Sequence, residues 1–83
     1  MPGMAVTGDI EQLRTLPVEE AEIRFLRLMI KHHQGGVEMA QAYLELGDQD
    51  EVSAFATSIV QVQNLEIDTM NLMLEQRGAD PLS

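Results

Sequence analysis

Two long stretches of the chain repeat apolar residues at the spacing of an α-helix, and a glycine separates them. The first stretch runs over about residues 18–46 and the second over about residues 50–77, with apolar side chains recurring every three or four positions. Gly47 follows the first stretch, at the place where a glycine commonly ends a helix. A connection of about 3–4 residues is short enough to force the two helices to lie antiparallel. The sequence therefore predicts an all-α fold built on a helical hairpin, and no strand pattern competes with it.

The segment before the hairpin divides into two parts. Residues 1–8 contain glycine and proline without a periodic pattern, which is typical of a flexible lead-in. Residues 9–16 are expected to form a short helix, and Pro17 suits the first turn of the helix that follows. We therefore expect a single helical domain over residues 9–78.

Local signals also place the ends of the second long helix. Asp48 or Asp50 can accept hydrogen bonds from the first turn, as N-cap residues do. Gly78, with a proline beyond it, is expected to stop the helix, and residues 79–83 are then a tail.

Composition excludes several classes of function. The chain of 83 residues carries 14 Asp and Glu against 5 Lys and Arg, so nucleic acid would be repelled. It has no cysteine, which rules out disulfides and thiolate metal sites. No run of about 18 apolar residues is present, so membrane insertion is not expected.

The apolar stripe on each long helix is wider than one neighbouring helix can cover. Phe25 and Tyr43 lie on the first stripe, and Phe55 and Met73 lie on the second. Apolar surface left over on both helices favours another pair of helices as a cover. We therefore expect a homodimer that completes a ferritin-like four-helix bundle.

Polar residues interrupt these stripes near the middle of each helix. His33, Gln63 and Glu66 lie within the stripes, and His32 lies at a margin. Burying such groups without partners costs about 1–3 kcal/mol each. Counting from the turn places His33 opposite Gln63 and Glu66 opposite Ile30, so the polar groups converge on one layer. Because adjacent residues diverge by about 100° around a helix, only His33 is expected to point squarely inward.

This layer has the residue types of a metal site. His32 and His33 with the nearby thioethers of Met29 and Met70 suit Cu(I). The same imidazoles with the carboxylate of Glu66 suit Zn, Fe or Mn. We predict a non-enzymatic metal-binding bundle that favours Cu(I), and binding should weaken below about pH 6, since protonated histidine cannot coordinate a metal.

Other interpretations stay open. His33 and Glu66 can also form only a hydrogen-bonded pair that fixes the register of a structural dimerisation module. Gln63, Met39 and Met73 are expected to support the layer rather than to coordinate the ion, and the methionines can equally be core filler.

A pair of glycines in mid-helix is a further departure from the pattern. Each glycine costs about 0.5–1 kcal/mol relative to alanine in a helix. We expect a continuous helix in which Gly36 permits a close approach of the partner helix and leaves room beside the histidines.

Two segments together resemble a known bacterial family. Residues 25–40 (FLRLMIKHHQGGVEMA) and residues 59–70 (IVQVQNLEIDTM) are similar to the motifs of the family called domain of unknown function 305. The matching positions are Met29, Ile30, His32, His33, Met39 and Ala40 in the first motif, and Gln63, Glu66, Ile67 and Met70 in the second. Lys31 and Gly36 stand where the family often has proline and alanine.

The resemblance carries its own expectations. It implies a ferritin-like helical fold, a periplasmic or secreted location, and an association with copper or silver tolerance. Many family chains carry two copies of the hairpin, and a single copy here favours a dimer. A di-iron oxidase is a weaker alternative, because such a site uses four Glu and two Glu-x-x-His motifs, whereas this chain has no Glu-x-x-His.

Overall fold

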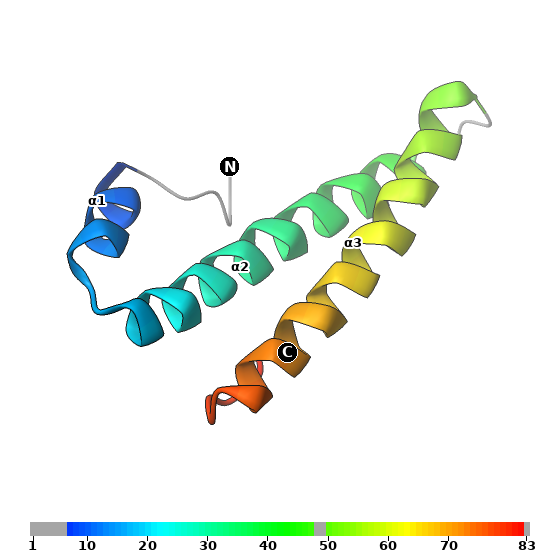
Figure 1. Cartoon of the computed structure of the whole chain (residues 1–83). Coiled ribbons are helices and arrows are strands. Elements are labelled where there is room, and N and C mark those ends of the chain that lie inside the picture. The colour runs from blue at the N-terminus through cyan, green and yellow to red at the C-terminus, as the bar shows by residue number, and fades with distance from the viewer. Residues whose placement is uncertain (1–6, 48–49, 83) are drawn as a thin grey trace.

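The computed structural model describes residues 7–47 and 50–82, which form three helices and no strand. Helix α1 spans Thr7–Thr15, α2 spans Val18–Leu44 and α3 spans Glu51–Gln76. Helices α2 and α3 pack against each other as an antiparallel hairpin, and α1 lies beside the beginning of α2 (Figure 1). The predicted all-α fold with two packed long helices is confirmed. Most of the lead-in predicted over residues 1–8, and Asp48 as a possible cap, lie outside the described residues.

Local backbone chemistry accounts for where α2 begins and ends. Pro17 stands just before the helix with φ of −56°, a value that its ring imposes. Its carbonyl accepts a hydrogen bond from the Ala21 amide at 2.8 Å. The helix ends at Leu44, two residues before the expected end, and Gly47 then adopts φ of +83°. Only glycine takes that left-handed conformation without strain, so it turns the chain toward α3.

Asp50 caps α3 and ties it to the end of α2. Its Oδ1 accepts a hydrogen bond from the Ser53 amide at 2.9 Å, and the Tyr43 hydroxyl donates to its Oδ2 at 3.1 Å. The amide hydrogen bond is the main reason that the pKa of Asp50 lies below its ordinary value, with the Tyr43 hydroxyl acting in the same direction. Asp50, one of the two predicted caps, is therefore the N-cap of α3.

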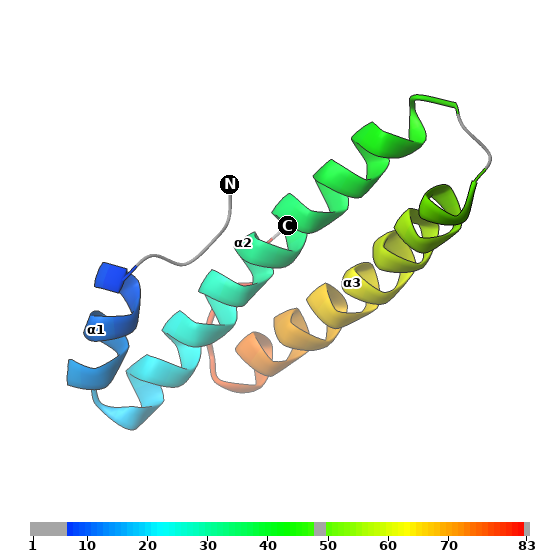
Figure 2. The ribbon, with the colours of Figure 1, turned by 90° about the horizontal axis from the view of Figure 1, so that it is seen from above.

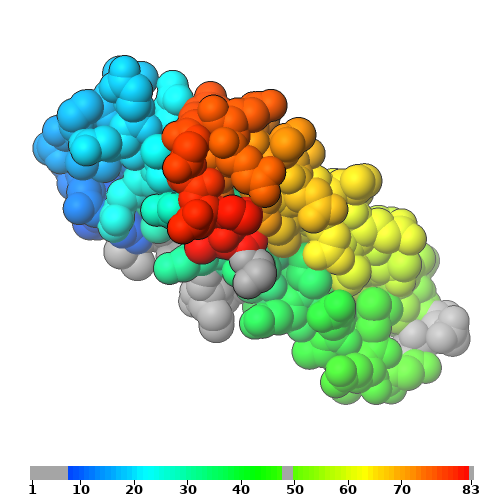
Figure 3. Space-filling view, turned by 90° about the horizontal axis from the view of Figure 1, so that it is seen from below, coloured from blue at the N-terminus to red at the C-terminus, as the bar shows by residue number. Residues whose placement is uncertain are grey.

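The apolar core lies at the end of the hairpin far from the turn. Leu26, Ile30 and Leu74 form a buried cluster, and Ala79 and Leu82 from the C-terminal segment pack against it. Figure 2 shows this segment turning back from the end of α3 toward α2, and Figure 3 shows it lying over both helices. The chain thus supplies a third layer for this half of the hairpin.

Side-chain hydrogen bonds fasten the C-terminal segment. Asn71 Nδ2 donates to the Leu82 carbonyl at 2.6 Å, and the Leu82 amide donates to Asn71 Oδ1 at 2.7 Å. Arg77 Nε reaches Glu22 Oε2 at 2.7 Å, which joins the end of α3 to the beginning of α2. The sequence had indicated only a tail here, because nothing local in the sequence shows that Asn71 meets residue 82.

The half of the hairpin nearer the turn is built differently. Its buried positions hold small or medium side chains: Val37, Ala40, Ser53 and Ala56. Large apolar side chains around them stay exposed, among them Met39, Val52, Phe55 and Val62. The wide stripes are therefore only partly covered within one chain.

None of the helices formed by the described residues combines the length and apolar character that crossing a bilayer would require.

Candidate metal centre

His33 is the most constrained polar residue of the mid-helix layer. Its side chain is 12% exposed, and its Nδ1 lies 2.8 Å from the Met29 carbonyl oxygen one turn back in α2. A carbonyl oxygen can only accept, so the hydrogen bond requires a proton on Nδ1. In the neutral ring that leaves Nε2 unprotonated and directed away from its own helix.

Glu66 is the residue of α3 that Nε2 faces. Its Oε2 lies 3.6 Å from His33 Nε2, which is too long for a direct hydrogen bond. Two ligands of one tetrahedral ion, each about 2.0–2.2 Å from the metal, lie about 3.4 Å apart. The two atoms therefore stand at about the separation of neighbouring ligands.

Other parts of the predicted layer are more open than expected. The Glu66 side chain is 54% exposed, and His32 is exposed although its ring centroid lies 6.0 Å from that of His33. The prediction that only His33 points inward is confirmed. The prediction that the whole layer is buried is wrong for one chain, because α3 covers only the His33 side of α2.

The register across the hairpin differs from the count by one helical turn. Gln63 lies against Gly36, and His33 meets Glu66 instead. Only one residue in three or four faces the partner helix. Counting residues from the turn therefore predicts which residues of α2 and α3 lie opposite each other only to within one helical turn.

Gly36 makes the close approach that the sequence predicts, but the space that it leaves is taken by Gln63. A Cβ added at Gly36 would lie 2.7 Å from Gln63 Oε1. That oxygen is buried and accepts no hydrogen bond within the described part of the chain. Gln63 is thus a polar group held at the seam, one turn from Glu66.

The methionines occupy unequal environments. Met70 packs against the core cluster, which accounts for it as an apolar side chain. Met29 is partly buried and supplies the carbonyl that holds His33. Met39 is 51% exposed and Met73 is 39% exposed. Of these four methionines, only Met29 lies next to the histidines in α2 and is also shielded from solvent.

An apolar groove leads up to the layer from the turn. It has a volume of about 240 Å³ and runs between α2 and α3, where Met39 and Tyr43 face Val52 and Phe55. Gly36 and Gln63 close its inner end, each three residues from a member of the His33–Glu66 pair.

Within residues 7–47 and 50–82, no group of three or more His, Asp and Glu side chains is close enough to hold a metal ion. One chain brings together one imidazole and one carboxylate, which is half of a four-coordinate site. The described residues also do not form the Glu-rich arrangement that a di-iron oxidase uses.

Comparison with known proteins was consistent with the motifs. A family model described as "Domain of unknown function (DUF305)" matches residues 1–74. No curated protein matches the chain.

Two crystal structures are similar to the fold. A DUF305 protein from Streptomyces coelicolor, described as a presumptive secreted protein, superposes with a TM-score of 0.88 at 37% identity, over 100% of this chain and 52% of that chain. A DUF305 fragment from Deinococcus radiodurans superposes with a TM-score of 0.82 at 47% identity, over 89% of this chain and 48% of that chain. The present chain thus spans about half the length of these two relatives.

Proposed function

The chain belongs to the DUF305 family, and on that premise we propose that it is a metal-binding protein, not an enzyme, whose site is completed between two copies. The observation that carries the proposal is the His33 imidazole, fixed through Nδ1 by the Met29 carbonyl, with Nε2 at 3.6 Å from Glu66 Oε2. Histidine ligands in metalloproteins commonly donate their second ring N–H to a carbonyl in this way, which fixes the tautomer and the direction of the free nitrogen.

The apolar groove supports a second copy of the chain as the partner. A two-fold dimer uses the same surface on both copies, so the groove beside Met39 and Phe55 would be covered on each. Because that groove ends one turn from His33 and Glu66, the partner would bring its own pair to the same level. Exposed His32 would then add a further imidazole from each copy.

Charge argues that the ion and the dimer form together. Each chain has a formal net charge of −9, so two copies repel one another. Bringing two Glu66 carboxylates toward one axis adds to the cost unless a cation lies between them. A bound metal ion offsets the repulsion between the two chains and the repulsion between the two carboxylates. The dimer fraction should therefore rise with metal occupancy.

We favour Cu(I) as the ion, with Zn(II) or Fe(II) as competitors. The thioether of Met29, which lies one turn from both histidines in α2, is a soft donor that suits Cu(I). The resemblance to a family with members associated with copper and silver tolerance supports the same ion. The His33–Glu66 pair by itself would also accept Zn(II) or Fe(II).

The test is a metal titration of the chain purified without a histidine tag. Cu(I) is titrated without oxygen against a chromophoric chelator, and Zn(II) and Fe(II) are titrated in parallel. His33→Ala and Glu66→Gln should each weaken binding by about tenfold or more. Gln41→Ala, an exposed change on the same helix, is the matched control and should have no effect.

Met29→Leu separates the choice of ion from the existence of the site. It keeps the apolar volume and removes the sulfur, so it should weaken Cu(I) and leave Zn(II) unchanged. If Zn(II) binds more tightly than Cu(I) and Met29→Leu has no effect, the preference for Cu(I) is wrong and the site stands. A parent chain that binds none of the three ions would overturn the metal site and favour a purely structural module.

Sedimentation with and without the bound ion tests the dimer. We expect the dimer fraction to increase when the metal is added and to return to its former value when a chelator removes it. A chain that stays monomeric with the metal fully bound would contradict the shared site.

The proposal includes a periplasmic or secreted location. The description of the Streptomyces coelicolor relative supports it.

A further inference from the structure

A hollow on α2, apart from the metal-binding layer, gathers three of the chain's five cationic side chains. Arg24, Arg27 and Lys31 line it together with apolar residues that include Leu16 and Leu82, and its volume is about 360 Å³. Pockets that hold small ligands have volumes of about 300–1,000 Å³. None of its lining residues belongs to the His33–Glu66 pair or to the apolar groove.

The cations in this hollow are poorly partnered. The Nε atoms of Arg24 and Arg27 are buried and donate no hydrogen bond within residues 7–47 and 50–82. Arg24 reaches Asp9 through Nη2 at 3.5 Å. Over the same residues, Arg27 and Lys31 have neither an ion pair nor a side-chain hydrogen bond. Buried guanidinium donors without an acceptor are unfavourable, and an oxyanion would satisfy them.

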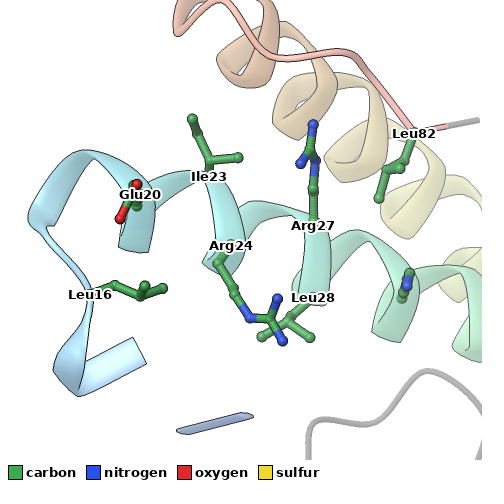
Figure 4. Close-up of a pocket in the computed structure, with 8 residues that line it drawn as sticks. Leu16, Glu20, Ile23, Arg24, Arg27, Leu28 and Leu82 are labelled. Atoms are coloured by element: carbon green, nitrogen blue, oxygen red, sulfur yellow. The ribbon is translucent and has the colours of Figure 1, made fainter. Parts of the chain in front are cut away.

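Their spacing concentrates the positive charge. Residues three, four and seven apart lie on one side of a helix, so the three cations start from the same side of α2, and Figure 4 shows the Arg24 and Arg27 guanidinium groups extending in different directions from it. The chain has an excess of acidic residues, so free anions are otherwise repelled. An anion would therefore bind most favourably at this local cationic patch.

The walls of the hollow are apolar and come from three segments of the chain. Figure 4 shows Leu16, from the link before α2, and Leu82, from the C-terminal segment, on opposite flanks of this part of α2, with Ile23 between them. Glu20 lies at the Leu16 end and would repel an anion there. An anionic group is therefore directed to the end formed by Arg27 and Lys31.

We infer that this hollow binds an anionic amphiphile, which is a small molecule with an oxyanion head and an apolar chain. Arg27 and Lys31 hold the head, and Leu16, Ile23 and Leu82 contact the apolar chain. Carboxylate and phosphate heads both match the arginine fork, so the head group is left to the experiment.

Calorimetric titration of the full chain with four probes tests the inference. Octanoate and octyl phosphate carry both features, acetate carries only the charge, and octanol carries only the apolar chain. At least one of the two amphiphiles should bind about tenfold more tightly than either acetate or octanol, and the tighter one identifies the head. If octanol binds as tightly as both amphiphiles, or if neither amphiphile binds, the inference is wrong.

Substitutions assign the binding to this hollow. Arg27→Gln and Lys31→Gln should each weaken the tighter amphiphile by about tenfold, with circular dichroism showing an unchanged helix content. Arg14→Gln removes an exposed cation of α1 that lies outside the hollow, so it makes the same change in net charge and should have no effect. Equal loss in all three variants, or loss in none, would overturn the site.

Discussion

The two halves of the hairpin contain the same two helices but bury their apolar surface in different ways. In the half far from the turn, called the closed half below, the C-terminal segment covers the cluster of Leu26, Ile30 and Leu74. Ile30 and Leu74 have no exposed surface there. In the half near the turn, called the open half below, no described segment covers the helices, and Phe55 is 66% exposed. The difference lies in the core between the helices, which is closed by large side chains in one half and not in the other, while Phe25 and Leu72 on the outer faces of the closed half are still more than half exposed.

The half-exposed layer lies at the border between these two halves. His33 is shielded as residues of the closed half are, whereas Glu66 and His32 are open as residues near the turn are. A site at such a border is pre-positioned on one side by a packed helix and is accessible on the other. That arrangement suits a ligand set that a second copy completes.

The largest expected change in the free energy of unfolding comes from shortening a buried side chain in the closed half. Ile30→Ala should lower the free energy of unfolding by about 3 kcal/mol, because it removes a fully buried side chain and leaves a cavity. Urea denaturation measures this change, at a protein concentration low enough that the chain is monomeric. If that variant does not fold, Ile30→Val should cost about 1 kcal/mol.

The matched change in the open half is Phe55→Ala. Because the side chain is exposed in one chain, its loss should change the free energy of unfolding of the monomer by less than about 0.5 kcal/mol. It should weaken association in sedimentation instead. A loss of monomer stability equal to that of Ile30→Ala would show that the two halves do not differ.

Releasing the C-terminal segment from the closed half should lower the free energy of unfolding by less than Ile30→Ala does. Asn71→Ala removes both hydrogen bonds to the backbone of Leu82 and should cost about 1–2 kcal/mol of unfolding free energy. Asn64→Ala, an exposed change on the same helix, is the control and should cost much less. Equal effects would indicate that the C-terminal segment adds no stability to the core.

The smallest effect is expected at the turn, and it depends on pH. The folded pKa of Asp50 lies below its unfolded value, so the cap stabilises the fold above about pH 3.9 and loses that contribution as the pH falls through the folded value. Asp50→Asn should therefore flatten the decrease in thermal midpoint below pH 4. Asp68→Asn, which removes an exposed carboxylate elsewhere on α3, is the control. An unchanged acid profile in Asp50→Asn would mean that the cap contributes nothing.

The candidate site could be predicted in composition but not in detail. Helical spacing was enough to bring His33 and Glu66 within one helical turn of each other and to single out His33, not His32, as the inward histidine. It could not show that Glu66 is half exposed, that Gln63 lies against Gly36, or that Arg24, Arg27 and Lys31 line a hollow. The spacing of those three cations was visible in the sequence, but a polar helix face has the same appearance when it is simply solvated.

The sequence by itself determined the features that depend on a few neighbouring residues. Pro17, Gly47 and Asp50 mark helix ends through their own backbone and side-chain chemistry, and the apolar spacing specifies two long helices. Only the tertiary structure decided the register between α2 and α3, the fold-back of the C-terminal segment, and which part of each wide stripe is covered. These depend on contacts between distant residues such as Asn71 and Leu82, and several registers one turn apart satisfy the same local pattern. Side-chain packing across the seam selects among them, and no local signal in the sequence carries that information.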